Sequence, residues 1–174
     1  MNILLISDTH GATIDIEKLL EQYKRSVELV CHMGDNAVDI QQFEQKYPQY
    51  SFVVVSGNTD VSPMAHNEVI ISLTAKNKEV KKVLLTHGHK QYVKSGLDRL
   101  KYYAKSQGVD ACFFGHTHYP YIEEAGGIFY MNPGSLIAPH VGFAPSFGLV
   151  SLQDNGVFAG MHLAINAMGL ANYG

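Results

Sequence analysis

The sequence has few cysteines: Cys31 and Cys112 are the only two, and each lies within an apolar run. Two isolated thiols exclude a disulfide framework and a Cys-x-x-Cys metal clip, so both side chains are expected to pack as small hydrophobic groups. Unpaired thiols persist in a reducing compartment. The sequence therefore predicts a cytoplasmic protein.

Long hydrophobic segments and blocks of basic residues are also missing. No apolar stretch is long enough to cross a bilayer, and the opening MNILLISDTH lacks a basic region and reaches Asp8 too early for a signal peptide. The formal net charge is -3 at pH 7, and the Lys and Arg residues are scattered. We therefore expect neither a membrane nor an extended nucleic acid as a partner.

The order of apolar runs predicts an α/β protein with one domain over residues 1–174. Seven runs are typical of short strands: Ile3–Ile6, Leu29–Cys31, Phe52–Val55, Val69–Leu73, Val80–Leu85, Ala111–Phe114 and Ile128–Met131. Helical patterns cover Ile14–Lys24, Val38–Tyr47 and Ser95–Gln107, the last opening with a Ser-x-x-Asp cap. Turn residues at Lys76–Lys78 and Asp154–Gly156 predict two hairpins, and the segment from about Ile165 has no clear period.

Polar, glycine-containing segments follow most of these strands. They are Asp8-Thr9-His10, Gly34-Asp35-Asn36, Gly57-Asn58-Thr59-Asp60, His87-Gly88-His89, Gly115-His116-Thr117-His118 and Asn132-Pro133-Gly134-Ser135. Any one of them alone is an ordinary turn sequence. In open α/β sheets, however, ligands bind beyond the carboxyl ends of the strands, and two His-x-His pairs gain little unless something binds them. The segments together predict a shared site.

The side chains of these segments indicate the ligand. Carboxylate, imidazole and amide groups without thiolate suit Mn²⁺, Fe²⁺, Zn²⁺ or Ni²⁺, and exclude an iron–sulfur or cysteine-rich zinc site. Seven candidate ligands exceed what one tetrahedral ion uses. Two neighbouring ions would use them, as in enzymes that displace groups at phosphorus.

In this order the motifs resemble the calcineurin-like metallophosphoesterase family, and the ThrHisGlyHis and AsnProGlySer loops are most similar to its small YfcE-type phosphodiesterase branch. The resemblance implies a sandwich of two mixed β-sheets flanked by helices, with a dinuclear metal site at the strand ends. It further implies that a hydroxide shared by two divalent ions, Mn²⁺ first among the candidates, attacks a small phosphorylated substrate. The implied ligands of one ion are Asp8, His10 and His118; those of the other are Asn58, His87 and His116; Asp35 bridges both.

The source of the leaving-group proton stays open. Larger family members carry a histidine where this chain has Thr59, and threonine is no acid at neutral pH. We expect His10 or His89, or less readily His66, to donate this proton, while Asp35 acts in catalysis as the shared ligand.

The second N–H of each ligand histidine needs an acceptor. We expect the Asn132–Ser135 loop to provide one, and Asp60 another unless Asp60 is a cap. Of the remaining histidines, His32 is expected under Asp35, His140 along the crevice and His162 in a structural role, and no arginine lies in a motif loop to hold phosphate.

The sequence bears on three alternative functions. Hydrolysis of a phosphomonoester at the same site is not distinguished from diester hydrolysis. A retromer subunit of the same family acts mainly as a protein-binding scaffold, although retention of every motif ligand disfavours that role here. A zinc hydrolase of the metallo-β-lactamase type needs His-x-His-x-Asp-His, whereas this chain has His87-Gly88-His89-Lys90-Gln91.

Ten Tyr and eight Phe residues either fill the core or line the face of a homo-oligomer.

Overall fold

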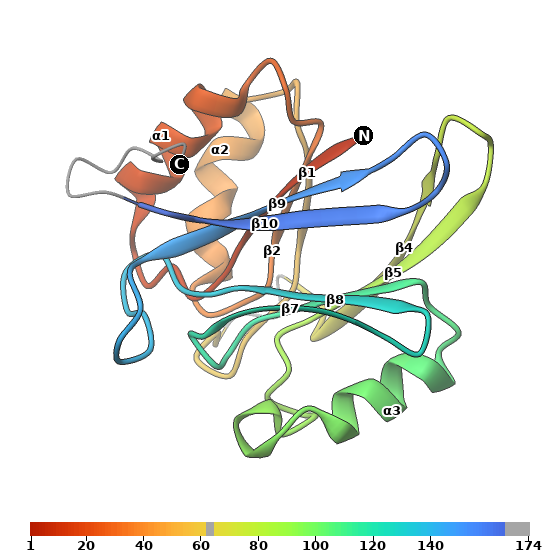
Figure 1. Cartoon of the computed structure of the whole chain (residues 1–174). Coiled ribbons are helices and arrows are strands. Elements are labelled where there is room, and N and C mark those ends of the chain that lie inside the picture. Colours follow the sequence, from red (N-terminus) through yellow and green to blue (C-terminus); the bar gives the residue numbers. More distant parts are fainter. Residues whose placement is uncertain (62–64, 166–174) are drawn as a thin grey trace.

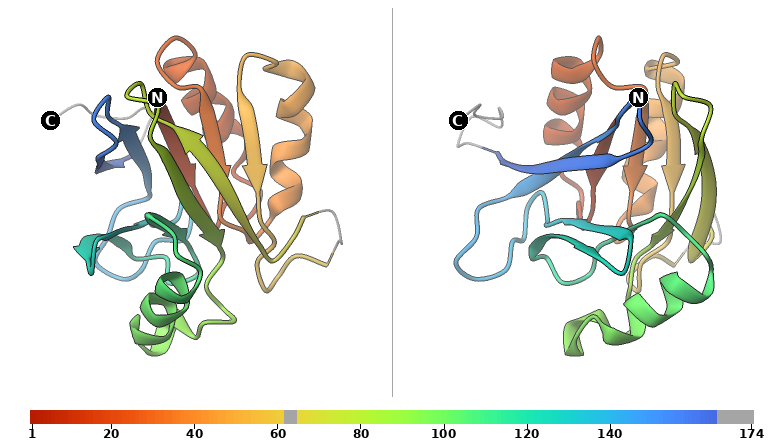
Figure 2. Two further views of the ribbon diagram at one scale, coloured as in Figure 1. Left: turned by 90° about the vertical axis from the view of Figure 1, so that its right-hand side faces the viewer. Right: turned by 45° about the vertical axis from the view of Figure 1, so that its right-hand side comes forward.

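A computed structural model describes residues 1–61 and 65–165 of the chain. Its strands form two five-stranded sheets, ordered β10-β9-β1-β2-β3 and β4-β5-β6-β8-β7. The sheets pack face to face, with helices on the outer side of each (Figures 1 and 2). This is the predicted sandwich of two mixed sheets, and the fold prediction is therefore confirmed.

Parallel strands form the centre of the first sheet. β1 (Asn2–Ile6) pairs in parallel with β2 (Leu29–His32), which pairs in parallel with β3 (Ser51–Val54). β9 (Ser146–Leu152) and β10 (Phe158–Ala164) complete the sheet as an antiparallel hairpin. The helices α1 (Thr13–Tyr23) and α2 (Gln41–Lys46), with the 3-10 turn η1 (Ala37–Ile40), connect the parallel strands.

The second sheet repeats this plan with antiparallel strands at both edges. β5 (Val80–Thr86), β6 (Ala111–Phe114) and β8 (Ile128–Pro133) are parallel. β4 (Glu68–Thr74) and β7 (Pro120–Ala125) pair with β5 and β8 from outside. The 3-10 turn η2 (Val93–Ser95) and α3 (Asp98–Ser106) join β5 to β6.

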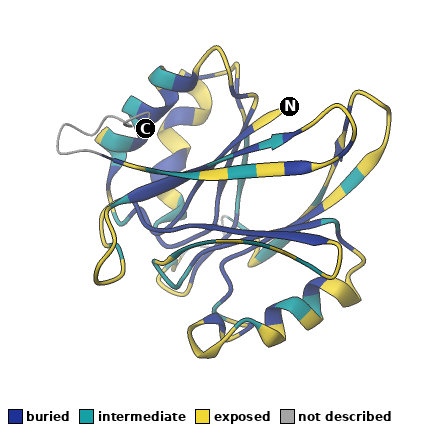
Figure 3. Cartoon of the chain, viewed as in Figure 1, coloured by how far each residue is buried: buried dark blue, intermediate teal, exposed yellow. Residues whose placement is uncertain are grey.

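Strand β1 shows why the first apolar run is continuous. Ile3 and Leu5 belong to the core between the two sheets, whereas Leu4 and Ile6 pack in the cluster that includes α1. All four are fully buried, because successive side chains point to opposite faces and both faces are covered (Figure 3). Each such aliphatic side chain contributes about 1.5–3 kcal/mol on burial.

The predicted strands and both hairpins are present, with ends shifted by no more than two residues. Edge strand β7 was missed, since Pro-Tyr-Ile-Glu-Glu-Ala is half exposed and carries two charges. The prediction that Ser95 caps the third helix was wrong. Helix α3 begins at Asp98, after Leu97, and has no side-chain cap, because Gly96 has a non-helical backbone with φ 130° and separates Ser95 from the helix. The predicted helix Val38–Tyr47 is divided into η1 and α2.

No helix among residues 1–61 and 65–165 combines the length and apolar character needed to span a membrane. The segment without a clear period lies, beyond Ile165, outside the described residues.

Candidate metal centre

The structure brings all seven predicted ligands together. Each follows one of the parallel strands β1, β2, β3, β5 or β6, whose carboxyl ends meet at one end of the sandwich. Two groups have potential ligand atoms within 4.8 Å of one another: Asp8, His10, Asp35 and His118, and Asp35, His87 and His116. Asn58 joins the second group, with its Oδ1 3.2 Å from His87 Nε2. Asp35 therefore lies between two clusters of donors.

Backbone strain is concentrated at this point. Among the described residues, eight other than glycine have a left-handed φ, and six of them lie in the site loops: Asp8, His10, Asp35, Asn36, His116 and His118. Each such residue costs roughly 1–2 kcal/mol. The loops also hold one another, because the Asp8 N–H donates to Gly34 O at 2.9 Å and the Thr9 N–H to Asp35 O at 3.2 Å. Strain retained in this way is typical of functional sites.

His87 presents an electron pair to the cluster. It is fully buried, and its Nδ1 lies 2.6 Å from Met33 O, which only accepts, so Nδ1 carries the proton. Around Nε2 lie Asn58 Oδ1 at 3.2 Å, His116 Nδ1 at 3.1 Å and Asp35 Oδ1 at 3.4 Å. One proton satisfies only part of this set, whereas one divalent cation satisfies all four donors. The donor set thus fits a metal ion.

A second unsatisfied group lies at Asp8. Its Oδ2 accepts hydrogen bonds from Ser7 Oγ at 2.5 Å and from the His116 N–H at 3.1 Å. No described residue makes a well-directed hydrogen bond to the buried Oδ1, although His118 Nε2 lies 3.1 Å away. Burial raises the pKa of Asp8, but the interactions with His118 and Ser7 outweigh burial and hold that pKa below its ordinary value. An ionised carboxylate with one oxygen that accepts no well-directed hydrogen bond is a suitable metal ligand.

His116 and His89 are held neutral. Burial lowers the pKa of His116 to about 4, helped by the charge of Lys94 and opposed by the charges of the carboxylates Asp8 and Asp35. Burial also lowers the pKa of His89, whose ring centroid lies 5.4 Å from that of His87 and 6.1 Å from that of His116. Among residues 1–61 and 65–165, His89 Nδ1 has no hydrogen-bond partner. His89 therefore lies beside the cluster, and its Nδ1 is not used in a hydrogen bond with the described residues.

A chain of hydrogen bonds lies under the cluster. His32, as expected, is buried below the Asp35 loop, where its Nδ1 accepts the Gly34 N–H at 3.1 Å. Its Nε2 lies 3.0 Å from Thr9 Oγ1, which donates to Asp39 Oδ2 at 2.7 Å. Burial lowers the pKa of His32 to about 4, so the ring is neutral and its Nε2–H donates to Thr9. The chain links the loops after β1 and β2 rigidly.

Asp60 and Asn132 support the site differently from the prediction. Asp60 accepts three backbone N–H groups, from Asp35 at 3.0 Å, Gly57 at 2.7 Å and Ala37 at 2.8 Å, and so clamps two loops together. Asn132 donates to Gly115 O at 2.8 Å and to Thr117 Oγ1 at 3.0 Å, which positions the loop after β6. In the described part of the chain, neither side chain hydrogen-bonds to a ligand histidine. For Asp60 this agrees with the alternative of a cap or turn residue, and the expectation that these groups accept the N–H of His87 or His118 was wrong.

Backbone carbonyls accept those N–H groups instead. Met33 O faces Nδ1 of His87, and Ala138 O faces Nδ1 of His118. A carbonyl is present at every residue, so no sequence signal marks these two. The sequence also missed Lys94, which lies near the site: its charge acts on the pKa of both His116 and His118.

Three other histidines have clear positions. His66 is exposed and forms a β-bridge with Val55, and none of its described contacts reaches the cluster. His162 Nε2 lies 2.8 Å from Asn132 O, which agrees with a structural role. His140 lines a pocket next to His118, as expected for a crevice residue.

The chain belongs to the calcineurin-like phosphoesterase superfamily, whose domain model matches residues 1–155. It is 32% identical over 156 residues to the probable metallophosphoesterase YsnB of Bacillus subtilis, with 89% of this chain and 86% of that protein covered. It is 29% identical over 192 residues to the phosphodiesterase YfcE of Escherichia coli, covering 95% and 99%. A predicted phosphoesterase from Streptococcus pneumoniae superposes with a TM-score of 0.79 at 26% identity, covering 94% and 88%. These similarities confirm the family and support a metal-dependent phosphoesterase.

The same fold also occurs in Vps29. Vps29 of Entamoeba histolytica, solved with Zn²⁺, superposes with a TM-score of 0.71 at 22% identity, over 95% of this chain and 100% of that one. At this identity the likeness shows the fold alone. It does not by itself decide between catalysis and protein binding.

Proposed function

We propose that this protein is a dinuclear metal-dependent phosphodiesterase that hydrolyses a small phosphodiester. The observation that carries the proposal is Asp35, which belongs to both groups of convergent ligand atoms. Asp8, His10 and His118 would hold one ion, and Asn58, His87 and His116 the other. The similarity to a protein named phosphodiesterase supports diester rather than monoester hydrolysis. Mn²⁺, one domain over residues 1–174 and a cytoplasmic location stay predictions.

When bound, the ions supply Lewis acidity to the phosphoryl oxygens and lower the pKa of a shared water, so that a bridging hydroxide is the expected nucleophile. The protein keeps the ligands in place. Met33 O and Ala138 O fix the tautomers of His87 and His118, and Asp60 holds Asp35 through its backbone N–H. Preorganised ligands need no rearrangement during the reaction.

Turnover with added metals tests the proposal. We expect purified protein, stripped of metal and supplied with Mn²⁺, to hydrolyse bis(4-nitrophenyl) phosphate, because this diester has a good leaving group and needs little acid assistance. The released 4-nitrophenol is measured by absorbance, and bound metal by elemental analysis. Absence of turnover with Mn²⁺, Ni²⁺, Fe²⁺ and Zn²⁺ would count heavily against the enzyme. Absence of any bound divalent ion as well would favour the scaffold.

His89, neutral in the resting site, is proposed to take up the proton released by the attacking water and to pass it to the leaving group, with His10 as the alternative in the other ligand group. The free Nδ1 and the position beside His87 and His116 support this role. We expect His89→Gln to lower kcat for diphenyl phosphate by roughly 100-fold, since phenol leaves poorly without a proton. The rate with bis(4-nitrophenyl) phosphate should fall much less.

The matched control is His66→Gln, an exposed histidine outside the cluster. It should leave both rates unchanged. If His89→Gln slowed the two diesters by the same factor, the proton would come from elsewhere and His10 would be tested next.

A further inference from the structure

Beside the candidate metal centre lies a pocket that none of the proposed catalytic steps uses. Its volume is about 730 Å³. The residues around it come from η2 and the start of α3, the loop after β6, strand β7 and the loop after β8, and include Lys94, Leu97, Tyr119, Tyr121, Pro139 and Val141. His118 and Thr117 also line it. Because His118 belongs to both, the pocket adjoins the cluster of ligand atoms at that residue.

Aromatic and apolar side chains line the pocket, and one of them, Tyr119, belongs to an aromatic cluster. Tyr119 packs edge-on against Phe143, with ring centroids 4.6 Å apart, and against His140 at 6.0 Å. Tyr119 keeps 41% of its surface exposed and Val141 keeps 91%. Exposed aromatic and aliphatic groups beside a polar site are typical of a surface that a ligand covers.

The surrounding loop is held in place before any ligand binds. The His140 N–H donates to His118 O at 3.0 Å, and the Phe143 N–H donates to His140 O at 3.0 Å. The backbone of a proposed metal ligand thus anchors the aromatic cluster directly. A rigid pocket of this kind costs a ligand little ordering entropy.

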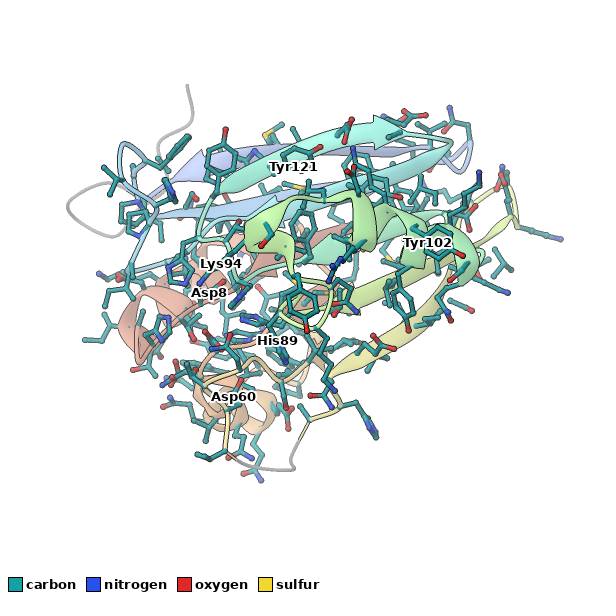
Figure 4. The ribbon with its side chains drawn as sticks, turned by 90° about the horizontal axis from the view of Figure 1, so that it is seen from below. Asp8, Asp60, His89, Lys94, Tyr102 and Tyr121 are labelled. Atoms are coloured by element: carbon teal, nitrogen blue, oxygen red, sulfur yellow. The ribbon has the colours of Figure 1, made fainter. Side chains whose placement is uncertain are left out.

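Lys94 provides the one cation among the described lining residues whose charge is permanent at neutral pH. No salt bridge joins Lys94 to a carboxylate in the described part of the chain, and its charge acts on His116 and His118. Figure 4 shows Lys94, Asp8 and His89 in one region, away from Tyr102 on α3. An ammonium group here complements the charge of a phosphoryl group at the cluster.

We propose that this pocket binds a planar aromatic substituent of the phosphate ester, an aryl ring or a nucleobase, while Lys94 contacts its phosphoryl oxygens. Tyr119 supplies the face on which the ring stacks. This inference rests on the proposed function, because the phosphoryl group is placed at the candidate metal centre. It assigns Tyr119 to ring recognition and Lys94 to charge recognition.

Phosphinates test the pocket apart from catalysis, because their phosphorus–carbon bonds are not hydrolysed. Diphenylphosphinate and dimethylphosphinate carry the same charge and differ only in their rings. With Mn²⁺ present, isothermal titration calorimetry should show wild-type protein binding the diphenyl compound at least about tenfold more tightly. Tyr119→Ala should remove most of that preference, and Tyr119→Phe should retain it.

Lys94→Gln should weaken both phosphinates by a similar factor, roughly three- to tenfold. The matched controls are Tyr102→Ala and Lys105→Gln, both on α3 and exposed, which should change neither affinity. Adenosine 5′-monophosphate compared with ribose 5-phosphate provides the nucleobase arm. If Tyr119→Ala affects only the phenyl pair, the pocket takes plain aryl rings; if it also affects the adenosine pair, the pocket takes nucleobases.

Equal binding of the two phosphinates by wild-type protein, or an unchanged preference in Tyr119→Ala, would overturn the inference. Turnover of bis(4-nitrophenyl) phosphate is measured on the same samples. Turnover without ring preference would reject the pocket alone, whereas ring preference without turnover would reject the catalytic proposal alone.

Discussion

Replacing Asp35 with asparagine is expected to lower kcat/KM for bis(4-nitrophenyl) phosphate by roughly 10³-fold or more, equivalent to about 4 kcal/mol of transition-state stabilisation. The substitution removes the negative charge and one oxygen from the position shared by both groups of ligand atoms. The remaining oxygen still accepts the Thr59 N–H, now 3.1 Å from Oδ1. The fold should therefore survive, with a melting temperature of the metal-free protein within roughly 4 °C of wild type.

Metal content separates this explanation from a general loss of structure. Elemental analysis should find fewer bound ions in Asp35→Asn than in wild-type protein. The control is Asp154→Asn, which alters an exposed carboxylate in the hairpin turn that pairs with Lys76. That variant should keep its rate and its metal. Wild-type turnover by Asp35→Asn would show that Asp35 is not the shared ligand.

Gly57→Ala is expected to damage both stability and activity. An added Cβ would lie 2.1 Å from Asp35 Oδ1 and 2.4 Å from Asp35 N. The second contact is with backbone, so the side chain of Asp35 cannot relieve it by rotating. We expect the free energy of unfolding to fall by about 2–4 kcal/mol. We also expect kcat/KM to fall roughly 100-fold, as a misplacement near 1 Å would cause.

Urea denaturation and steady-state kinetics measure the two effects. Gly126→Ala is the control, because its Cβ would meet no atom within 4 Å although φ is +60°. It should cost about 1 kcal/mol in stability and nothing in rate. Wild-type stability in Gly57→Ala would mean that the loops after β2 and β3 are further apart than the structure has them.

The strands and the polar residues after them were predictable for a local reason. A strand covered on both faces, such as β1, needs an unbroken apolar run, and Asp8 and His10 break that run. Ligand chemistry is carried by residue type, so carboxylate, imidazole and amide groups indicated a divalent metal before any coordinates. The structure brings those residues together, and their roles as ligands stay a prediction.

Other features left no such trace. Strand β7 carries two adjacent glutamates at a sheet edge, where half-exposed residues resemble a loop. The start of α3 followed the geometry of Gly96 rather than the Ser95 motif. Asp60 contacts backbone N–H groups of residues far away in sequence, and sequence spacing does not reveal such partners.

The sequence by itself determined the kind of chemistry, because the electron-pair donors are side chains with fixed identities. It also determined the alternation of strands and helices, because each type of element is buried through its own pattern of apolar residues. Only the tertiary structure decided how Asp35 sits between two groups, which carbonyls orient His87 and His118, and how Lys94 and Tyr119 come to flank the site. Those relations depend on contacts between distant segments. Contacts of that kind are set by packing and backbone hydrogen bonding, to which every residue contributes the same groups.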